Sequence, residues 1–196
     1  MKKSWIIIIV IVVLAFIAYS SVKGTYNSMV TLGETVDKQW ADVENVYQRR
    51  ADLIPNLVST VKGYATHEKE TLEGVINARA KATSTTINAG DLSANNIAAF
   101  QKAQDGLSSA LSKLMVVVER YPELKANQNF LELQAQLEGT ENRIAVERRK
   151  FNEAAQNYNT FIKLFPKNLF ANMFGFEKKP YFEAQQGADT APKVEF

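Results

Sequence analysis

The chain has 196 residues, which is enough for one domain together with a membrane anchor. It contains no cysteine and one histidine, His67. This composition excludes disulfides, cysteine nucleophiles and thiolate metal sites, and it argues against a zinc enzyme. The net charge of +2 depends on lysines beside the apolar N-terminus, because 20 basic and 21 acidic residues remain without Lys2, Lys3 and Lys23. Such a balance is unlike the basic stripe of a nucleic-acid-binding protein, so we expect no nucleic acid partner.

The uncharged segment Ser4–Val22 is predicted to be a transmembrane helix. A helix of this length spans about 28 Å, close to the roughly 30 Å thickness of the hydrocarbon layer. Trp5 and Tyr19 lie near its ends, where amphipathic aromatic side chains favour the membrane interfaces. The triplet Ala18–Tyr19–Ser20 has the small-x-small form of a signal-peptidase site, so secretion with cleavage remains an alternative to an uncleaved anchor.

Positive charges beside this segment predict its orientation. Lys2, Lys3 and the amino terminus precede it, whereas Lys23 is the immediate positive charge that follows it. The more positive flank stays in the cytoplasm. We therefore expect a cytoplasmic N-terminus and a body outside, in the periplasm or at the cell surface.

Beyond the anchor, apolar residues recur at helical spacing, which predicts an all-α body. One heptad series near the start contains Tyr26, Gly33, Trp40, Tyr47 and Ile54. A second, longer series contains Phe130, Leu137, Ile144, Phe151, Tyr158 and Phe165. Between them lies a third series with a single polar interruption, Gln104. Heptad repeats of this kind are typical of coiled-coil-like packing at shallow angles.

Three breaks divide the body into four long helices. Asp52 with Pro55 has the form of a helix start, Ser84–Asn96 that of a loop, and Tyr121–Pro122 that of a helix end followed by a new start. We therefore predict an up-and-down antiparallel four-helix bundle. The alternative is a helix that continues through a kink at Pro55 and makes a longer, thinner hairpin. The predicted regions are an anchor (1–23), a bundle (24–182) and a flexible tail (183–196).

An up-and-down order returns the end of the fourth helix to the membrane. The sequence that follows, FPKNLFANMFGF, is rich in aromatic residues, and we predict that Phe170, Phe174 and Phe176 lie near the bilayer. Two interpretations remain open. These aromatics either close the base of the bundle, or enter the interface or bind a partner's membrane helix.

The chain resembles the LemA family. The segments that carry the resemblance are YNSMVTLGETVDKQWADVENVYQRRADLIPNLVSTVKGYATHE, ERYPELKANQNFLELQAQLEGTENRIAVERRKFNEAAQNYNTFI and FPKNLFANMFGF. The resemblance implies a membrane-tethered four-helix bundle without an established catalytic activity. It also implies a link to membrane protein quality control, or to magnetosome membranes as in one relative. Many members are lipoproteins, but this chain has no cysteine to acylate and must rely on its peptide anchor.

The family motifs concentrate charged and polar residues at one junction. The candidate cluster consists of Arg49, Arg50, Asp52, Pro55, Asn56, Glu119, Glu141 and Arg143. We expect a structural network in which Arg49 or Arg50 forms a bidentate pair with Glu119 or Glu141; a ligand site is the alternative. His67–Glu70 lacks the second histidine of a zinc-binding helix and is predicted to be a solvated face. Asn152, Asn157 and Asn159 predict hydrogen bonds that set helix register or hold the terminal segment.

No phosphate-binding loop, nucleophile elbow or metal-ligand pattern occurs in the sequence, so we expect no cofactor, no metal and no catalytic residues. The leading functional hypothesis is a non-catalytic scaffold or adaptor for other proteins of the cell envelope. The alternative is a sensor that binds a ligand or lipid in a pocket between helices. Self-association is permitted by the pattern but not required.

Overall fold

The computed structural model describes residues 3–183, and within this range every regular element is helical. The elements are α1 (Lys3–Lys62), α2 (Lys69–Ser84), a 3-10 turn η1 (Ala89–Asp91), α3 (Ala94–Val118), α4 (Pro122–Lys125), α5 (Gln128–Lys163) and α6 (Lys167–Phe174). The prediction of an all-helical chain with a long apolar N-terminal helix is confirmed. The predicted tail lies outside the described residues, apart from Glu183.

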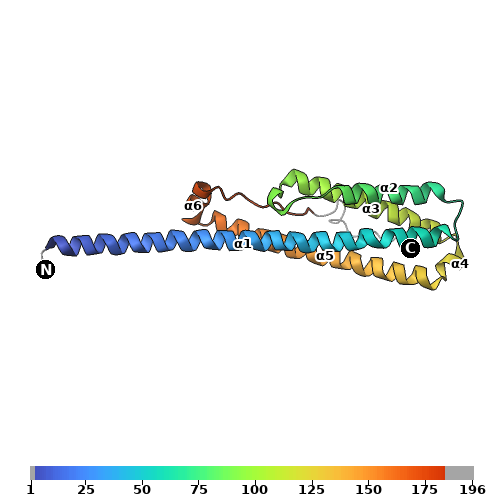
Figure 1. The fold of residues 1–196 in the computed structure, drawn as a ribbon, viewed down its shortest axis with the longest axis horizontal. Coiled ribbons are helices and arrows are strands. Elements are labelled where there is room, and N and C mark those ends of the chain that lie inside the picture. Colours follow the sequence, from blue (N-terminus) through green and yellow to red (C-terminus); the bar gives the residue numbers. More distant parts are fainter. Residues whose placement is uncertain (1–2, 184–196) are drawn as a thin grey trace, which may run out of the picture.

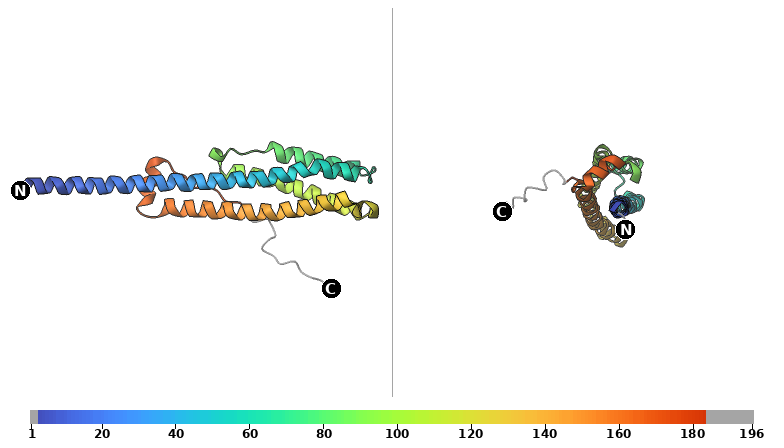
Figure 2. Two further views of the ribbon diagram at one scale, coloured as in Figure 1. Left: turned by 60° about the horizontal axis from the view of Figure 1, so that its bottom comes forward. Right: turned by 90° about the vertical axis from the view of Figure 1, so that its left-hand side faces the viewer.

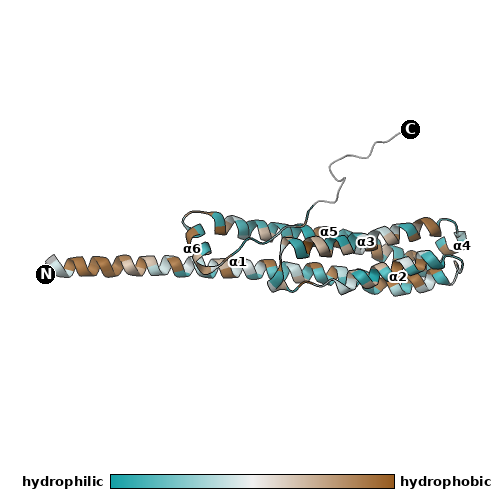
Figure 3. Cartoon of the chain, turned by 90° about the horizontal axis from the view of Figure 1, so that it is seen from above, coloured by the Kyte–Doolittle hydropathy of each residue, from teal (hydrophilic) through white to brown (hydrophobic). Residues whose placement is uncertain are grey.

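The long helices alternate in direction and lie side by side (Figure 1). α1 contacts α5 along much of its length and also contacts α2, which in turn packs on α3. The apolar first third of α1 projects beyond the other helices, as its brown colour in Figure 3 shows. The helices therefore form an elongated body, and the apolar first part of α1 protrudes from one end of it.

The predicted break at Asp52 and Pro55 is wrong, and the alternative of a helix that continues through Pro55 is observed, because α1 runs to Lys62. Proline has no N–H, so a helical Pro55 leaves the carbonyl of Ala51, four residues earlier, without its usual donor. Arg79 of α2 takes that place, and its Nε donates to the Ala51 oxygen at 2.7 Å. The reversal between the first two helices lies at Gly63–Glu68 instead.

Arg79 and Pro55 are therefore expected to be energetically coupled. Replacing Arg79 by Ala leaves the buried Ala51 carbonyl unpaired and is expected to cost about 1–3 kcal/mol of unfolding free energy. In a Pro55→Ala background the restored N–H satisfies the same carbonyl, so Arg79→Ala should cost clearly less. Urea denaturation of the four chains of this double-mutant cycle, in detergent micelles, measures the coupling. Equal costs in both backgrounds would contradict this account.

The later boundaries follow the prediction more closely. The expected loop 84–96 contains η1, and Ser93 caps α3 by accepting a hydrogen bond from the Asn96 N–H at 3.2 Å. Pro122 does start a helix, but α4 ends at Lys125. Asn127 then caps α5, because its side-chain oxygen accepts from the Phe130 N–H at 3.1 Å. The predicted fourth helix is thus one short turn and one long helix.

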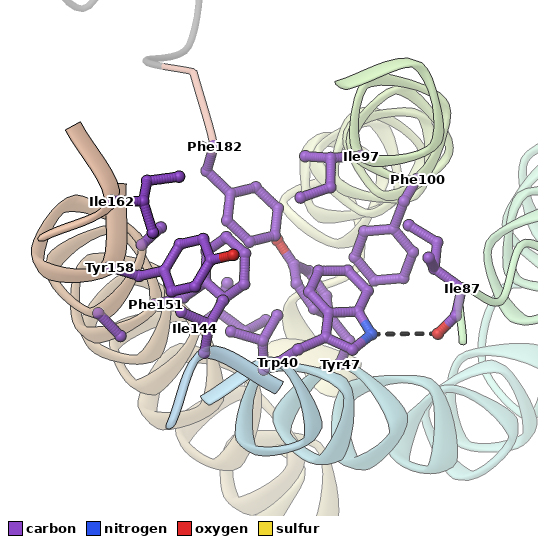
Figure 4. Packing of buried hydrophobic residues seen from close by; sticks show 14 of the residues in the cluster. Trp40, Tyr47, Ile87, Ile97, Phe100, Ile144, Phe151, Tyr158, Ile162 and Phe182 are labelled. Atoms are coloured by element: carbon purple, nitrogen blue, oxygen red, sulfur yellow. Dashed lines mark hydrogen bonds between the residues drawn. The ribbon is translucent and has the colours of Figure 1, made fainter. Parts of the chain in front are cut away.

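Two hydrophobic clusters make up the core. The cluster nearer the anchor is centred on Trp40, which is fully buried and donates from Nε1 to the Ile87 carbonyl at 3.1 Å (Figure 4). The Trp40 ring stacks on Phe182 and meets Phe100 and Phe151 edge-on, with centroid distances of 5.2–5.9 Å. The second cluster lies farther from the anchor and contains Ile54, Leu57, Leu114 and Phe130.

Two asparagines of α5 hold a non-helical segment, residues 176–183, which we call the C-terminal strap. Asn152 binds both the N–H and the C=O of Phe182, at 2.8 and 3.0 Å. Asn159 binds both backbone groups of Lys179, at 2.9 and 2.8 Å. The spacing matches, since seven helical residues and three extended residues both span about 10 Å. The predicted asparagine contacts with the terminal segment are confirmed for these two residues, whereas Asn157 is exposed.

Replacing Asn159 by Ala is expected to release the strap, because the Lys179 N–H and C=O both lose their partner. The local opening should make trypsin cleave after Lys178 several-fold faster than in the native chain, whereas the Lys179–Pro180 bond resists trypsin in both. Limited proteolysis followed by mass spectrometry measures the rate. Asn157→Ala removes the same side chain from an exposed position of the same helix and should leave the rate unchanged. If both variants are cleaved alike, the asparagine pairing does not hold the strap.

Candidate functional site

A polar layer separates the two hydrophobic clusters, and Arg50 lies at its centre. Its side chain is almost fully buried on α1, between Tyr47 in one cluster and Ile54 in the other. Nη1 donates to Ser108 Oγ of α3 and to Glu141 Oε2 of α5, both at 2.9 Å. Nη2 donates to the Gln104 side-chain oxygen at 2.7 Å and to its carbonyl at 3.3 Å.

Gln104 connects this layer to the remaining helix. Its Nε2 donates to the carbonyl of Ala82, at 3.3 Å, near the end of α2. One chain of hydrogen bonds therefore runs through α1, α2, α3 and α5. Buried polar layers of this type fix the register of packed helices, because a shifted register would leave charged and polar groups unpaired.

The electrostatics of the layer favour a fixed, positively charged Arg50. Glu141 pairs with it from a half-exposed position on α5, so this carboxylate keeps part of its hydration. The guanidinium also lies 5.1 Å from the centre of the Tyr47 ring. Burial raises the pKa of the Tyr47 phenol, which therefore stays neutral and presents its ring to the cation. Within residues 3–183, Arg50 Nε is buried and has no hydrogen-bond acceptor.

An open groove lies between α3 and α5 on one side of this layer. Its volume is about 400 Å³. Arg50 and the side chains of Leu111, Met115 and Leu137 line it together with polar residues; these are Ser108, Ser112, Gln134, Glu138 and Glu141. Gln134 donates to Glu138 at 2.9 Å along the edge. The groove thus combines an apolar lining with a fixed ion pair and one further carboxylate.

The other residues of the predicted cluster do not join this layer. Arg49, Asp52, Pro55 and Asn56 are exposed on α1, and Asp52 accepts a bond from Gln48 at 2.7 Å. Glu119 pairs with Lys125 at 2.6 Å, near the start of α4, and Arg143 is exposed on α5. The structure therefore unites Arg50 with Glu141 through one Nη1 contact, and the predicted bidentate geometry is not observed.

Phe170, Phe174 and Phe176, which were predicted to lie near the membrane, are on α6 and the strap. They lie at the end of the body opposite the groove. Phe174 and Phe176 meet Tyr26 of α1 edge-on, with ring centroids 5.1 and 5.5 Å apart. Phe170 and Phe176 are partly buried against the cluster around Trp40, whereas Phe174 remains exposed. These residues contribute to closing the base of the body, and α6 packs just beyond the apolar segment of α1.

Sequence reasoning missed Gln104 and Ser108 as members of the polar layer. Gln104 was visible as the one polar residue in an apolar helical series, and a buried polar residue in such a position needs a charged or polar partner. The partner, Arg50, is 54 residues away, so the pairing itself could not be identified from spacing.

Residues 3–183 contain no group of three or more His, Asp or Glu side chains that could hold a metal ion. His67 is exposed in the turn before α2, and the neighbouring Glu68 binds Arg120 and the Tyr121 hydroxyl instead. That hydrogen bond raises the pKa of the Tyr121 phenol.

Among the helices of residues 3–183, α1 alone is long and apolar enough to cross a membrane. Magnetosome protein MamQ 2 of Paramagnetospirillum magneticum is 30% identical to this chain over 204 aligned residues, covering 94% of this chain and 73% of that protein. Magnetosome protein MamQ of Magnetospirillum gryphiswaldense is 29% identical, and the alignment covers 94% of this chain and 74% of that protein. Protein LemA of Metamycoplasma hominis is 23% identical, and the alignment covers 74% of this chain and 62% of that protein. None of these names denotes an enzyme, and the magnetosome relatives together with the apolar helix identify a membrane protein.

The LemA family model matches residues 39–196, which include the helices that carry the polar layer and the α3–α5 groove. The resemblance carried by the sequence motifs is thereby confirmed, and the chain belongs to the LemA family.

Proposed function

We propose that this protein is a non-catalytic, membrane-anchored adaptor whose four-helix bundle docks an amphipathic helix of another envelope protein in the α3–α5 groove. The observation that carries the proposal is the groove itself. α3 and α5 are connected through Arg50 rather than packed closely against each other, which leaves Leu111 and Met115 partly exposed above the buried Leu137. A groove with an apolar lining and polar edges accepts the apolar face of a helix.

Charge indicates the nature of the partner. The groove contains one cation, Arg50, and two carboxylates, Glu138 and Glu141. Arg50 is buried and already paired with Glu141, so Glu138 presents the uncompensated charge to an incoming surface. A helix with leucine-like residues on one face and a lysine or arginine beside them complements this lining.

The position of the groove supports a protein partner over a lipid. At about 1.5 Å per helical residue, Arg50 lies about 40 Å beyond Val22 along α1. A lipid would have to leave the bilayer to reach the groove. A soluble domain of an envelope protein, or a long membrane-proximal helix, reaches it directly.

Two neighbouring residues of α3 provide the test. Met115 lines the groove, whereas Val116 is highly exposed and is not part of the lining. Tagged full-length chains would be purified from native membranes after mild crosslinking, and captured proteins quantified by mass spectrometry. A specific partner should be lost from Met115→Glu and retained by Val116→Glu. Capture that is equal in both variants would exclude the groove as the docking site.

We also propose that the anchor is uncleaved and holds the body outside the cytoplasm. Continuity of α1 through Ala18–Ser20 supports the first point, and the lysines before Ser4 support the second. Because the chain has no cysteine, an Asn77→Cys variant carries a single thiol, at an exposed position on α2. A membrane-impermeant maleimide should label it in cells with an intact inner membrane. Labelling that requires lysis would place the body in the cytoplasm.

The sensor alternative keeps one supporting observation. The groove volume of about 400 Å³ lies in the range of small-molecule pockets, roughly 300–1,000 Å³. A soluble short-chain phospholipid that raises the melting temperature of the full chain, and fails to do so in Met115→Glu, would favour a sensor. The adaptor proposal expects no such shift.

A further inference from the structure

α6 and the turn before it carry an apolar surface that no other described part of the chain covers. Phe165, Leu169 and Met173 are 80%, 56% and 64% exposed. They recur every four residues, so Leu169 and Met173 share one face of α6 and Phe165 precedes it in the turn from α5. The opposite face packs inward, because Ala171 is buried and Phe170 lies against the core. α6 is therefore amphipathic, with its outward side apolar.

The location of this surface points to a particular occupant. Figures 1 and 2 show α6 lying across α1 at the end of the body nearest the apolar N-terminal segment. Phe174 of α6 packs on Tyr26, which lies about 6 Å beyond Val22 at ~1.5 Å per residue. The headgroup layer extends roughly 5–8 Å beyond the hydrocarbon core on each side. With α1 across the bilayer, α6 lies at the depth of the headgroups.

Charge around the surface agrees with a membrane interface. Lys163 and Lys178 are exposed at the two ends of this region, and Lys167 lies over the Phe161 ring at 3.6 Å. Glu177 is the neighbouring acidic residue. Lysines beside an apolar face are typical of helices that lie in the plane of the interface.

We infer that α6 is a second membrane contact, an interfacial helix that places Phe165, Leu169 and Met173 into the headgroup region of the same bilayer that α1 crosses. The lipid surface is the occupant, not a second protein. This contact would hold the body at a fixed distance and orientation relative to the membrane, which the single helix α1 alone does not do. The inference depends on the anchor and is independent of the α3–α5 groove.

Depth measurements on the full-length chain test the inference. Leu169→Cys and Met173→Cys would each carry a single environment-sensitive fluorophore, in vesicles of phosphatidylcholine and phosphatidylglycerol. Tyr19→Cys is the positive control in the anchor, and Val116→Cys is the matched control, an exposed apolar residue on α3. Labels at 169 and 173 should be quenched by lipids with a shallow nitroxide and be several-fold less accessible to iodide than the label at 116.

Two results would overturn the inference. In the first, the labels at 169 and 173 are as accessible to iodide, and as little quenched by lipid, as the label at 116, while the label at 19 is quenched by lipid. This result counts when the labelled chains have the same urea unfolding midpoint as the unlabelled chain. In the other, protection at 169 and 173 appears only at high protein-to-lipid ratio, which would assign the surface to a second copy of the chain. If labelling at one of the two positions alters the unfolding midpoint, the variant labelled at the other position provides the measurement, because each side chain is exposed.

Discussion

Replacing Trp40 by Ala is expected to destabilise the body by about 3–5 kcal/mol, the usual cost of removing a large aromatic side chain from a packed core. Trp40 is fully buried, contacts three aromatic rings and donates to Ile87. Its loss opens a cavity and leaves the Ile87 carbonyl without its donor. Urea denaturation of the full chain in micelles, followed by far-UV circular dichroism, measures the change.

Trp5 is the matched control for this substitution. It is the other tryptophan of the chain and lies exposed in the apolar segment of α1. Trp5→Ala should leave the unfolding of the body unchanged. Trp40→Phe should fall between the native chain and Trp40→Ala, because it keeps one ring but not the Nε1 donor. A Trp40→Ala cost below about 1 kcal/mol would be inconsistent with a core centred on this residue.

The second large effect is expected at Arg50. Arg50→Ala should cost about 2–3 kcal/mol, because it leaves the buried Gln104 side-chain oxygen without its donor, while the half-exposed Glu141 carboxylate can return to water. Arg50→Lys should recover little of this loss, since one ammonium group cannot donate to α3 and α5 with the geometry of a guanidinium fork. The same denaturation experiment provides the measurement.

Arg49 tests whether position or charge alone is responsible. It is the adjacent residue, has the same side chain and is exposed. Arg49→Ala should change the unfolding free energy by less than about 0.5 kcal/mol. Equal losses at positions 49 and 50 would contradict the role of the polar layer.

The heptad pattern predicted the core except at the ends of its two series, where Tyr26 and Phe165 are exposed. Trp40, Tyr47, Ile144 and Phe151 were all assigned by their spacing and are buried. A repeat that extends over many turns is informative because the same face of a helix must remain covered along its whole length. The contacts of Asn152 and Asn159 with the terminal segment were also predictable, because asparagine is unfavourable inside a helix unless its side chain has a specific partner.

The break at Pro55 was mispredicted because the decisive residue is distant in sequence. A proline at this position is typical of a helix start, and nothing local indicates that Arg79 will satisfy the Ala51 carbonyl. The apolar surface of α6 was missed for a different reason. Aromatic composition selected Phe170 and Phe176, which pack inward, and Phe174, which is exposed but meets Tyr26. The exposed apolar face is instead defined by the four-residue spacing of Phe165, Leu169 and Met173.

The central claim is that a protein partner occupies the α3–α5 groove, and photocrosslinking in living cells tests it most directly. Gln134 lines the groove and Gln136 is exposed on α5 outside the lining, so a photoreactive residue at each position forms a matched pair. We predict a discrete crosslink to another envelope protein from position 134 and none from position 136. A crosslink of equal yield from both positions, or exclusively from 136, would contradict the proposed adaptor.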